Sequence, residues 1–214
     1  MLNKPAGWTS FDVVRKIRNV TREKKVGHGG TLDPFATGLL ILGTGRDTKR
    51  LSAITQSRKT YEARLLLGKA TDTMDSEGKI VETADVPPLT TDSITATLKA
   101  FHGIQKQVPP MYSAKKIDGK RLYKLARQNI EVDRPAVEIE VHKMELMAWN
   151  DPVLDFRVTS SKGTYIRVLG ADLARALGSV GHLVELKRTA IGDYQLGDAL
   201  TIEKFIQQWK STAT

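Results

Sequence analysis

The chain has 214 residues and a net charge of +9, with 33 lysines and arginines against 24 aspartates and glutamates. This balance favours a polyanionic partner such as a nucleic acid, although a soluble protein can be basic without binding one. The absence of cysteine excludes a disulfide scaffold, a cysteine nucleophile and cysteine-ligated zinc or iron–sulfur sites. The expected location is the cytoplasm, because no stretch reaches the roughly 20 apolar residues of a membrane helix and no signal-peptide pattern opens the chain.

In the first half of the chain, the residue pattern predicts two helices and several strands. Thr9 or Ser10 can cap a helix that runs to about Asn19, with Phe11 and Val14 on its apolar face. Further elements are expected as a buried strand over 39–42, a strand over 58–68, the second arm of a hairpin over 79–82, and a helix that carries Ile94, Leu98 and Phe101.

In the second half, alternating apolar residues favour strands. The expected elements are strands around 137–141 and 154–158, a helix over 165–177, a strand over 182–191, and a last helix from Thr201 to about Trp209. The predicted fold class is α+β, with a mixed, mostly antiparallel central sheet flanked by helices. No repeat or linker divides the chain, so residues 1–214 are expected to form a single catalytic domain with a basic segment around 108–130.

One loop combines several residue types that determine the backbone conformation. The stretch GHGGTLDPFATGLL, residues 27–40, places Gly27, Gly29 and Gly30, a histidine and an Asp-Pro pair ahead of an apolar run. Glycine allows close backbone approaches that a side chain blocks, and Pro34 disfavours the helical conformation at Asp33. Such a loop can hold the Asp33 carboxylate beside a bulky ligand. Out of context, an aspartate that caps a turn is the more common interpretation.

Nucleotide and metal motifs are incomplete. Residues 65–72, LLLGKATD, end like a phosphate-binding loop, but Ala63 stands where the pattern requires glycine. Residues 43–47, GTGRD, begin like a dinucleotide fingerprint, but Thr48 occupies the position of the third glycine. The four histidines show no metal-ligand spacing, so the sequence indicates neither a metal nor a nucleotide cofactor.

Five blocks occur in a fixed order: NKPAGWTSFDVV (3–14), KVGHGGTLDPFATGLL (25–40), YEARLLLGKATDTMDSEG (61–78), VPPMYSAKKIDGKRLYKLAR (108–127) and SKGTYIRVLGADLARALG (161–178). Together they resemble the TruB family of tRNA pseudouridine synthases, from Leu2 to about Lys204. The resemblance implies the pseudouridine synthase fold and an isomerase that converts uridine to pseudouridine at position 55, in the T-loop of tRNA. It also implies that neither a metal nor an organic cofactor takes part.

The resemblance assigns catalytic roles to three residues. Asp33 matches the family's catalytic aspartate, Tyr61 matches its active-site tyrosine, and Arg167 matches the arginine beside the carboxylate. Tyr165 and Leu186 are implied to lie near them.

The resemblance also assigns residues to RNA binding. Lys4 matches the lysine of the first motif, and His28 matches a histidine that holds the RNA once the target base has flipped out. The basic segment is expected to grip phosphates of the T-arm as a mobile lid, because phosphate contacts dominate RNA affinity. Its cations are Lys115, Lys116, Lys120, Arg121, Lys124 and Arg127. Taken alone, this segment is more typical of an ordinary solvated helix face.

The chain departs from the family pattern at both ends. Family members usually carry a few more residues before the NKP motif, and longer bacterial members add a C-terminal RNA-binding domain of the PUA type. Residues up to Thr214 leave no room for that domain, so we expect none. We also expect a monomer that needs no protein partner and no membrane, with the T-arm of tRNA as its partner.

The implied chemistry suits a single carboxylate. The reaction breaks the bond between C1′ and N1, turns the uracil over and joins C1′ to C5, so no redox cofactor is required. Asp33 can attack C1′ or remove a ribose proton on the way to a glycal, and the sequence leaves both routes open. An arginine beside Asp33 favours its ionised form, a tyrosine positions the uracil first and transfers protons second, and Leu186 excludes water.

Two other functions stay open at this point. An RNA-folding helper that opens the tRNA elbow without chemistry would not need Asp33, Tyr61 and Arg167 together. A guide-RNA-dependent enzyme would keep the chemistry and act on another RNA.

Overall fold

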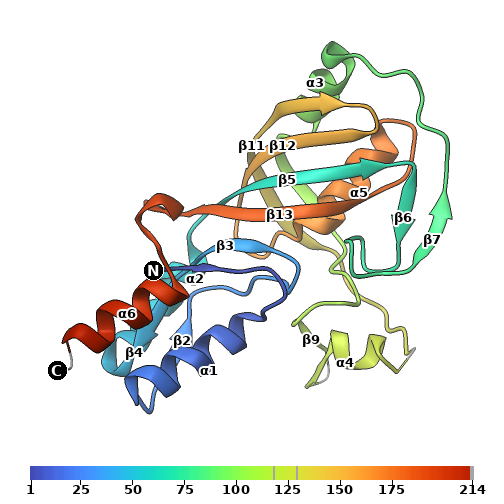
Figure 1. The fold of residues 1–214 in the computed structure, drawn as a ribbon. Coiled ribbons are helices and arrows are strands. Elements are labelled where there is room, and N and C mark those ends of the chain that lie inside the picture. Colours follow the sequence, from blue (N-terminus) through green and yellow to red (C-terminus); the bar gives the residue numbers. More distant parts are fainter. Residues whose placement is uncertain (118, 129, 213–214) are drawn as a thin grey trace. The chain divides into compact units, whose positions relative to one another are not determined.

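The computed structural model describes residues 1–117, 119–128 and 130–212. Its backbone contacts define two compact units, one from residues 1–62 and 186 onward and the other from residues 63–185. Strands β5 (Lys59–Leu67) and β13 (Gly181–Ile191) contribute residues to both units. The mostly antiparallel strands and the flanking helices confirm the predicted α+β class (Figure 1).

The first unit carries a sheet with the order β15-β1-β3-β13. Strand β1 (Leu2–Lys4) runs parallel to β15 (Leu200–Thr201) and antiparallel to β3 (Thr37–Leu40), and β3 runs parallel to the end of β13. The other short elements of this unit are β2 (Val26–His28), β4 (Leu42–Thr44), η1 (Gly45–Arg50), α2 (Leu51–Gln56), β14 (Tyr194–Gln195) and η2 (Leu196–Asp198).

Helices α1 (Ser10–Thr21) and α6 (Ile202–Thr212) pack together in the first unit, as Figure 1 shows. Thr9 caps α1 as predicted, because its side chain accepts a hydrogen bond from the Asp12 backbone while the Asp12 carboxylate accepts from the Thr9 backbone. The apolar face of α1 differs from the prediction at Phe11, whose side chain is 61% exposed. Buried positions are instead Ser10, Val13, Val14 and Ile17.

The apolar run at 39–42 forms two strands where one was predicted. Leu39 and Leu40 belong to β3, whereas Leu42 begins β4, which pairs with β2 in a separate antiparallel sheet. Leu39 and Ile41 pack with Ile191 in one core cluster, and Leu40 packs in another. Consecutive apolar residues enter two different cores because successive side chains of an extended chain point to opposite faces.

The second unit carries the strand order β13-β5-β12-β11-β8, and β11 pairs antiparallel with both of its neighbours. Helices α3 and α5 pack against each other, and α3 also packs against β11. The elements of this unit are β6 (Lys69–Thr71), β7 (Ile80–Thr83), α3 (Thr91–Ala100), β8 (Gly103–Gln107), β11 (Val137–Asn150), β12 (Val153–Ser160) and α5 (Ile166–Ala176). The predicted helices and strands of this part of the chain are thus confirmed.

The basic segment is built from β9 (Lys116–Ile117), β10 (Lys120–Arg121) and α4 (Leu122–Ala126). Strands β9 and β10 pair antiparallel, and the Tyr123 backbone N–H donates to the Ser113 carbonyl. Leu122 and Ala126 are buried. In the part of the chain that the structure describes, no helix has the length and apolarity needed to cross a membrane.

Candidate active site

Asp33 lies in the loop between β2 and β3 of the first unit and is half-buried. Its carbonyl accepts a hydrogen bond from the Ala36 backbone N–H at 3.2 Å, which closes a turn. On one side, the buried Ser10 hydroxyl accepts from the Leu32 N–H at 2.8 Å and lies 3.3 Å from the Leu32 carbonyl. On the other side, the Pro34 carbonyl accepts from the Gly7 N–H at 2.9 Å. The backbone is therefore fixed both before and after Asp33.

Lys4 supports the same turn from β1. Its side chain is fully buried, and its ammonium donates to the carbonyls of Pro5 at 2.8 Å, Trp8 at 2.6 Å and Pro34 at 3.1 Å. A buried ammonium requires such partners, because an uncompensated buried charge is very costly. The predicted RNA contact of Lys4 stays a prediction, and these hydrogen bonds give Lys4 a role in positioning the Asp33 turn.

Arg188 is a positioning residue that the sequence analysis did not identify. It is fully buried on β13, and its guanidinium donates to the carbonyls of Leu39 at 2.8 Å, Thr31 at 3.2 Å and Gly30 at 3.1 Å. The planar fork of an arginine is suited to several fixed acceptors at once. The available signal was the alternating pattern of β13, in which Arg188 faces the same side as the buried Leu186.

Gly38 allows the close approach of β3 to Arg188. Its φ is +106°, and a Cβ at this position would lie 2.3 Å from the Arg188 carbonyl oxygen. The two residues are partners in the parallel pairing of β3 with β13. Only glycine meets both the conformational and the steric requirement here.

His28 lies on β2, close to the Gly30 backbone. Burial lowers the pKa of its imidazole, the positive charge of Arg188 lowers it further, and the Gly30 backbone opposes the change. The Nδ1 atom is buried and has no hydrogen-bond partner among the described residues. His28 is therefore a neutral side chain near pH 7 with one ring nitrogen unused.

Tyr61 and Leu186 belong to the first unit, on β5 and β13. Both side chains are buried, and both occupy inward positions of the alternating burial pattern of their strands. Their burial agrees with the water-excluding and base-positioning roles that the sequence predicts, although their catalytic roles stay predictions.

In the second unit, Arg167 is buried at the start of α5 and is held by acceptors. Its Nη1 donates to the Thr73 carbonyl and its Nη2 to the Tyr112 carbonyl, both at 2.7 Å. Asp75, also buried, lies 3.3 Å from Nη1 and is itself fixed by the Thr73 hydroxyl at 2.6 Å. The structure shows that it helps to orient Arg167.

Tyr165 immediately precedes α5 and is fixed through its backbone. The buried Gln107 side chain accepts from the Tyr165 N–H at 2.8 Å and donates to the Tyr165 carbonyl at 3.1 Å. Gln107 ends β8 directly before the basic segment. One glutamine therefore joins the start of that segment to the start of the helix that carries Arg167.

The basic segment presents its cations to solvent. Lys116, Lys120 and Arg121 are exposed, as are Lys124 and Arg127, and Lys115 is half-buried. Within the described residues none of these six cations forms an ion pair, although Arg127 lies over the Tyr123 ring at 5.6 Å. An uncompensated cluster of this kind attracts phosphates.

The predicted site residues are thus divided between the units. Lys4, His28, Asp33, Tyr61 and Leu186 belong to the first, and Tyr165, Arg167 and the basic segment belong to the second. The expected pairing of Asp33 with Arg167 stays a prediction. Among residues 1–117, 119–128 and 130–212, no group of histidine, aspartate or glutamate side chains is arranged to hold a metal ion.

Comparisons with known proteins identify the family. Residues 18–166 match the model of the TruB family pseudouridylate synthase N-terminal domain. The chain is 47% identical over 207 residues to tRNA pseudouridine synthase B of Desulfotalea psychrophila, covering 94% of this chain and 84% of that protein. It is 45% identical over 213 residues to tRNA pseudouridine synthase B of Chlorobaculum tepidum, covering 97% and 89%.

A solved structure gives the same indication for the fold. The chain matches the crystal structure of a Cbf5-Nop10-Gar1 complex with a TM-score of 0.77 and 29% identity, over its full length. It spans 55% of that matched chain. The family match covers more than half of the sequence and includes the loop that carries Asp33. The chain therefore belongs to the TruB family of pseudouridylate synthases.

Proposed function

We propose that this protein converts the uridine at position 55, in the T-loop of tRNA, to pseudouridine, with Asp33 as the reacting carboxylate. The proposal is carried by the fixed turn of Asp33, whose neighbours Leu32 and Pro34 are both held by hydrogen bonds from other elements. Family members of high identity are named for this reaction on tRNA. Attack at a single carbon atom requires that the reacting group is held in position, and a fixed backbone contributes to this.

The proposed reaction begins at the C1′ atom of the flipped uridine. The bond from C1′ to N1 breaks, and the uracil leaves with its bonding electron pair. In the direct route, the Asp33 carboxylate forms an ester to C1′; in the other, it removes the C2′ proton to give a glycal. The uracil turns so that C5 faces C1′. The C1′–C5 bond then forms as the ester bond between C1′ and Asp33 breaks or, in the glycal route, as C2′ regains the proton that Asp33 had removed. The C5 proton leaves while N1 gains one. No atom is added or lost overall.

Three further side chains complete the proposed site. Arg167 pairs with Asp33 and keeps it ionised, since an opposite charge favours the carboxylate form. Tyr61 positions the uracil and afterwards assists the transfer of the C5 proton. Leu186 keeps water from C1′, which would otherwise release the base. The burial of Arg167, Tyr61 and Leu186 supports these roles.

Binding of the RNA is assigned to His28 and the basic segment. A T-loop uridine must leave its stack to react, which costs a few kcal/mol. The neutral, partly buried ring of His28 suits the space that the base vacates. The exposed lysines and arginines of 115–127 supply phosphate contacts as a lid. Lys4 and Tyr165 contribute by positioning the loops beside the substrate.

We further propose that the enzyme acts as a monomer, in the cytoplasm and without a cofactor. All residues assigned to the reaction come from one chain, and the absence of cysteine suits a reducing compartment. The Cbf5-Nop10-Gar1 complex shares less sequence with this chain than the tRNA pseudouridine synthases do. This difference favours tRNA as the substrate.

The test is nucleoside mapping by mass spectrometry of an unmodified tRNA transcript after incubation with the protein and no additive. The expected result is one pseudouridine, at the T-loop uridine. A second transcript with cytidine at that position is the control and should gain none. Pseudouridine at another position, or none in either transcript, would contradict the proposed function.

A further inference from the structure

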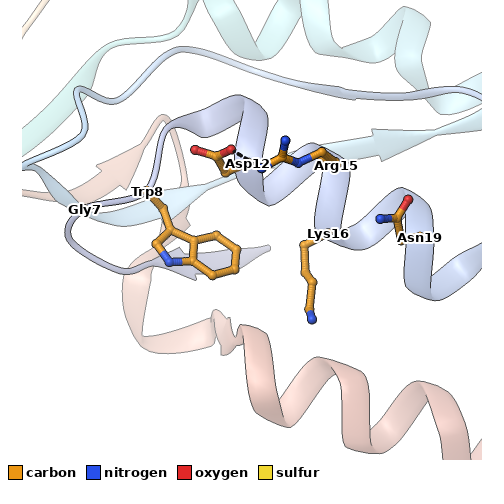
Figure 2. Close-up of a pocket in the computed structure, with 6 residues that line it drawn as sticks. All are labelled: Gly7, Trp8, Asp12, Arg15, Lys16 and Asn19. Atoms are coloured by element: carbon orange, nitrogen blue, oxygen red, sulfur yellow. Dashed lines mark hydrogen bonds and ion pairs between the residues drawn. The ribbon is translucent and has the colours of Figure 1, made fainter.

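A hollow of about 360 Å³ lies along α1, apart from the Asp33 carboxylate but within the same unit. It is lined by Gly7, Trp8, Asp12, Arg15, Lys16 and Asn19 (Figure 2). Positions 12, 15, 16 and 19 share one face of the helix, since they are three, four and seven residues apart. This face is the one opposite the buried Val13 and Ile17, so the helix contributes only polar groups to the hollow.

An aromatic ring forms the other wall. Trp8 packs against the core cluster that contains Val14, which fixes the indole. In Figure 2 the indole and the Lys16 side chain extend into the same space beside α1. A rigid aromatic face next to a cation is therefore open to a ligand.

The charged groups of the hollow are not equivalent. Arg15 donates to the Asp12 carboxylate at 2.8 Å, and the Thr9 hydroxyl also donates to that carboxylate at 2.6 Å. Lys16 is exposed and has no ion pair in the part of the chain that the structure describes. Lys16 therefore remains available for an anion, and the exposed Asn19 amide can both donate and accept.

This combination matches one nucleotide better than other ligands. An aromatic face stacks on any base with little sequence preference, and a neighbouring cation can bind the phosphate. An apolar ligand would leave Lys16 and Arg15 unused, and an inorganic anion would leave the indole unused. The volume is at the small end of the range for ligand pockets, which suits a single base with its sugar and phosphate.

We propose that this hollow binds one unpaired nucleotide of the RNA substrate, other than the uridine that reacts. The inference rests on the proposed function, since it takes the RNA from there. The loop that carries Trp8 is joined to the Asp33 turn: Gly7 donates to the Pro34 carbonyl, and Lys4 bridges the carbonyls of Trp8 and Pro34. A nucleotide held on Trp8 therefore fixes the RNA relative to the catalytic loop.

Equilibrium binding of a labelled tRNA transcript tests the proposal, with Trp8→Leu, Trp8→Phe and Lys16→Gln compared with the unaltered protein at one salt concentration. Trp8→Leu should weaken binding about tenfold, within the range measured for loss of one stacked base. Trp8→Phe should retain most of the affinity, because a phenyl ring still stacks. Lys16→Gln should weaken binding and reduce the slope of log affinity against log salt by about 0.7 to 0.9.

Matched controls are Phe11→Leu, an exposed aromatic on the same helix outside the hollow, and Lys204→Gln, an exposed lysine on α6. Both should bind the transcript as the unaltered protein does. Thermal unfolding of Trp8→Leu and Trp8→Phe shows whether both variants are equally folded at the temperature of the binding experiment. At equal folded fraction, a lower RNA affinity of Trp8→Leu than of Trp8→Phe reports the loss of stacking and not a loss of packing.

The outcomes are distinct. If the unaltered protein makes pseudouridine and Trp8→Leu and Lys16→Gln bind RNA within twofold of it, the inference is wrong and the proposed function stands. If the unaltered protein neither binds nor converts tRNA, the inference and the proposed function are both wrong.

A titration with UMP and AMP completes the test. Saturable binding of either mononucleotide that depends on Trp8, with unchanged RNA affinity in the variants, would make the hollow a free-nucleotide site and contradict the proposal.

Discussion

The ammonium of Lys4 donates a hydrogen bond across 3.1 Å to the carbonyl of Pro34, the residue that follows Asp33. The contact joins the first strand of the chain to the loop that carries the proposed reacting carboxylate. Because the same ammonium also binds the carbonyls of Pro5 and Trp8, a single buried charge ties three pieces of backbone together. The turn that carries Asp33 is therefore held by a side chain that need not touch the RNA.

Replacement of Lys4 by methionine should destabilise the protein. The change keeps the length of the side chain but leaves buried carbonyls without their donor, at a cost of at least about 2 kcal/mol in the free energy of unfolding. Urea denaturation checks this value. Lys24→Met, at an exposed lysine, is the matched control and should change stability by less than about 0.5 kcal/mol. Equal stability of the two variants would contradict the role given to Lys4.

Arg188→Lys should slow pseudouridine formation more than it weakens RNA binding. Lysine keeps the charge, but its single ammonium cannot reproduce the fork that binds the carbonyls of Gly30, Thr31 and Leu39. We expect at least a tenfold lower single-turnover rate, about 1.4 kcal/mol in the barrier, with tRNA affinity nearly unchanged. Lys187→Met, at the exposed neighbour, should have the normal rate. A proportional loss of affinity would instead indicate contact with the RNA.

The pKa of His28 should be measurable below the ordinary value of about 6.5 by NMR titration. Because burial lowers this pKa in the folded state, the unfolded chain binds the proton first as the pH falls. The free energy of unfolding should therefore decrease as the pH drops from about 6.5 toward the folded-state pKa. In His28→Gln this part of the pH dependence should be absent. A variant with the same pH dependence as the unaltered protein would show that His28 titrates normally.

The basic segment should make RNA binding depend on salt. Each of Lys116→Gln and Lys120→Gln should reduce the slope of log affinity against log salt by about 0.7 to 0.9, since each phosphate contact releases counterions. Titration of a labelled transcript at several salt concentrations measures the slope. Lys99→Gln, at an exposed lysine on α3, should leave it unchanged. Identical slopes in all three variants would exclude the segment from phosphate binding.

Local sequence signals predicted most elements of the fold because each signal acts within a few residues. The Thr9 cap and the Gly178 stop define helices α1 and α5 through hydrogen bonds and backbone conformation that are local. The run at 39–42 was misread because four consecutive apolar residues carry no periodicity, and the switch between two sheets depends on β2 and β13. The exposure of Phe11 likewise depends on how α1 meets the rest of the core.

The loop that carries Asp33 could be predicted from the sequence, but the side chains that support this loop could not. Asp33 stands out through the glycines and the proline around it, and the family resemblance adds its role. Arg188 and Asp75 were missed because a charged residue in a strand or a turn is usually exposed. Their function depends on carbonyls and on a guanidinium far away in the sequence, which no local pattern encodes.

The most direct test of the account compares Asp33→Asn with the unaltered protein on one tRNA transcript. Asparagine keeps the size of the side chain but cannot attack C1′ or take up a proton as a carboxylate does. Asp47→Asn, at an exposed aspartate of η1, is the control and should be fully active. We predict that Asp33→Asn folds and binds the transcript with unchanged affinity while forming no pseudouridine at the T-loop uridine. Normal conversion by Asp33→Asn would contradict the central claim.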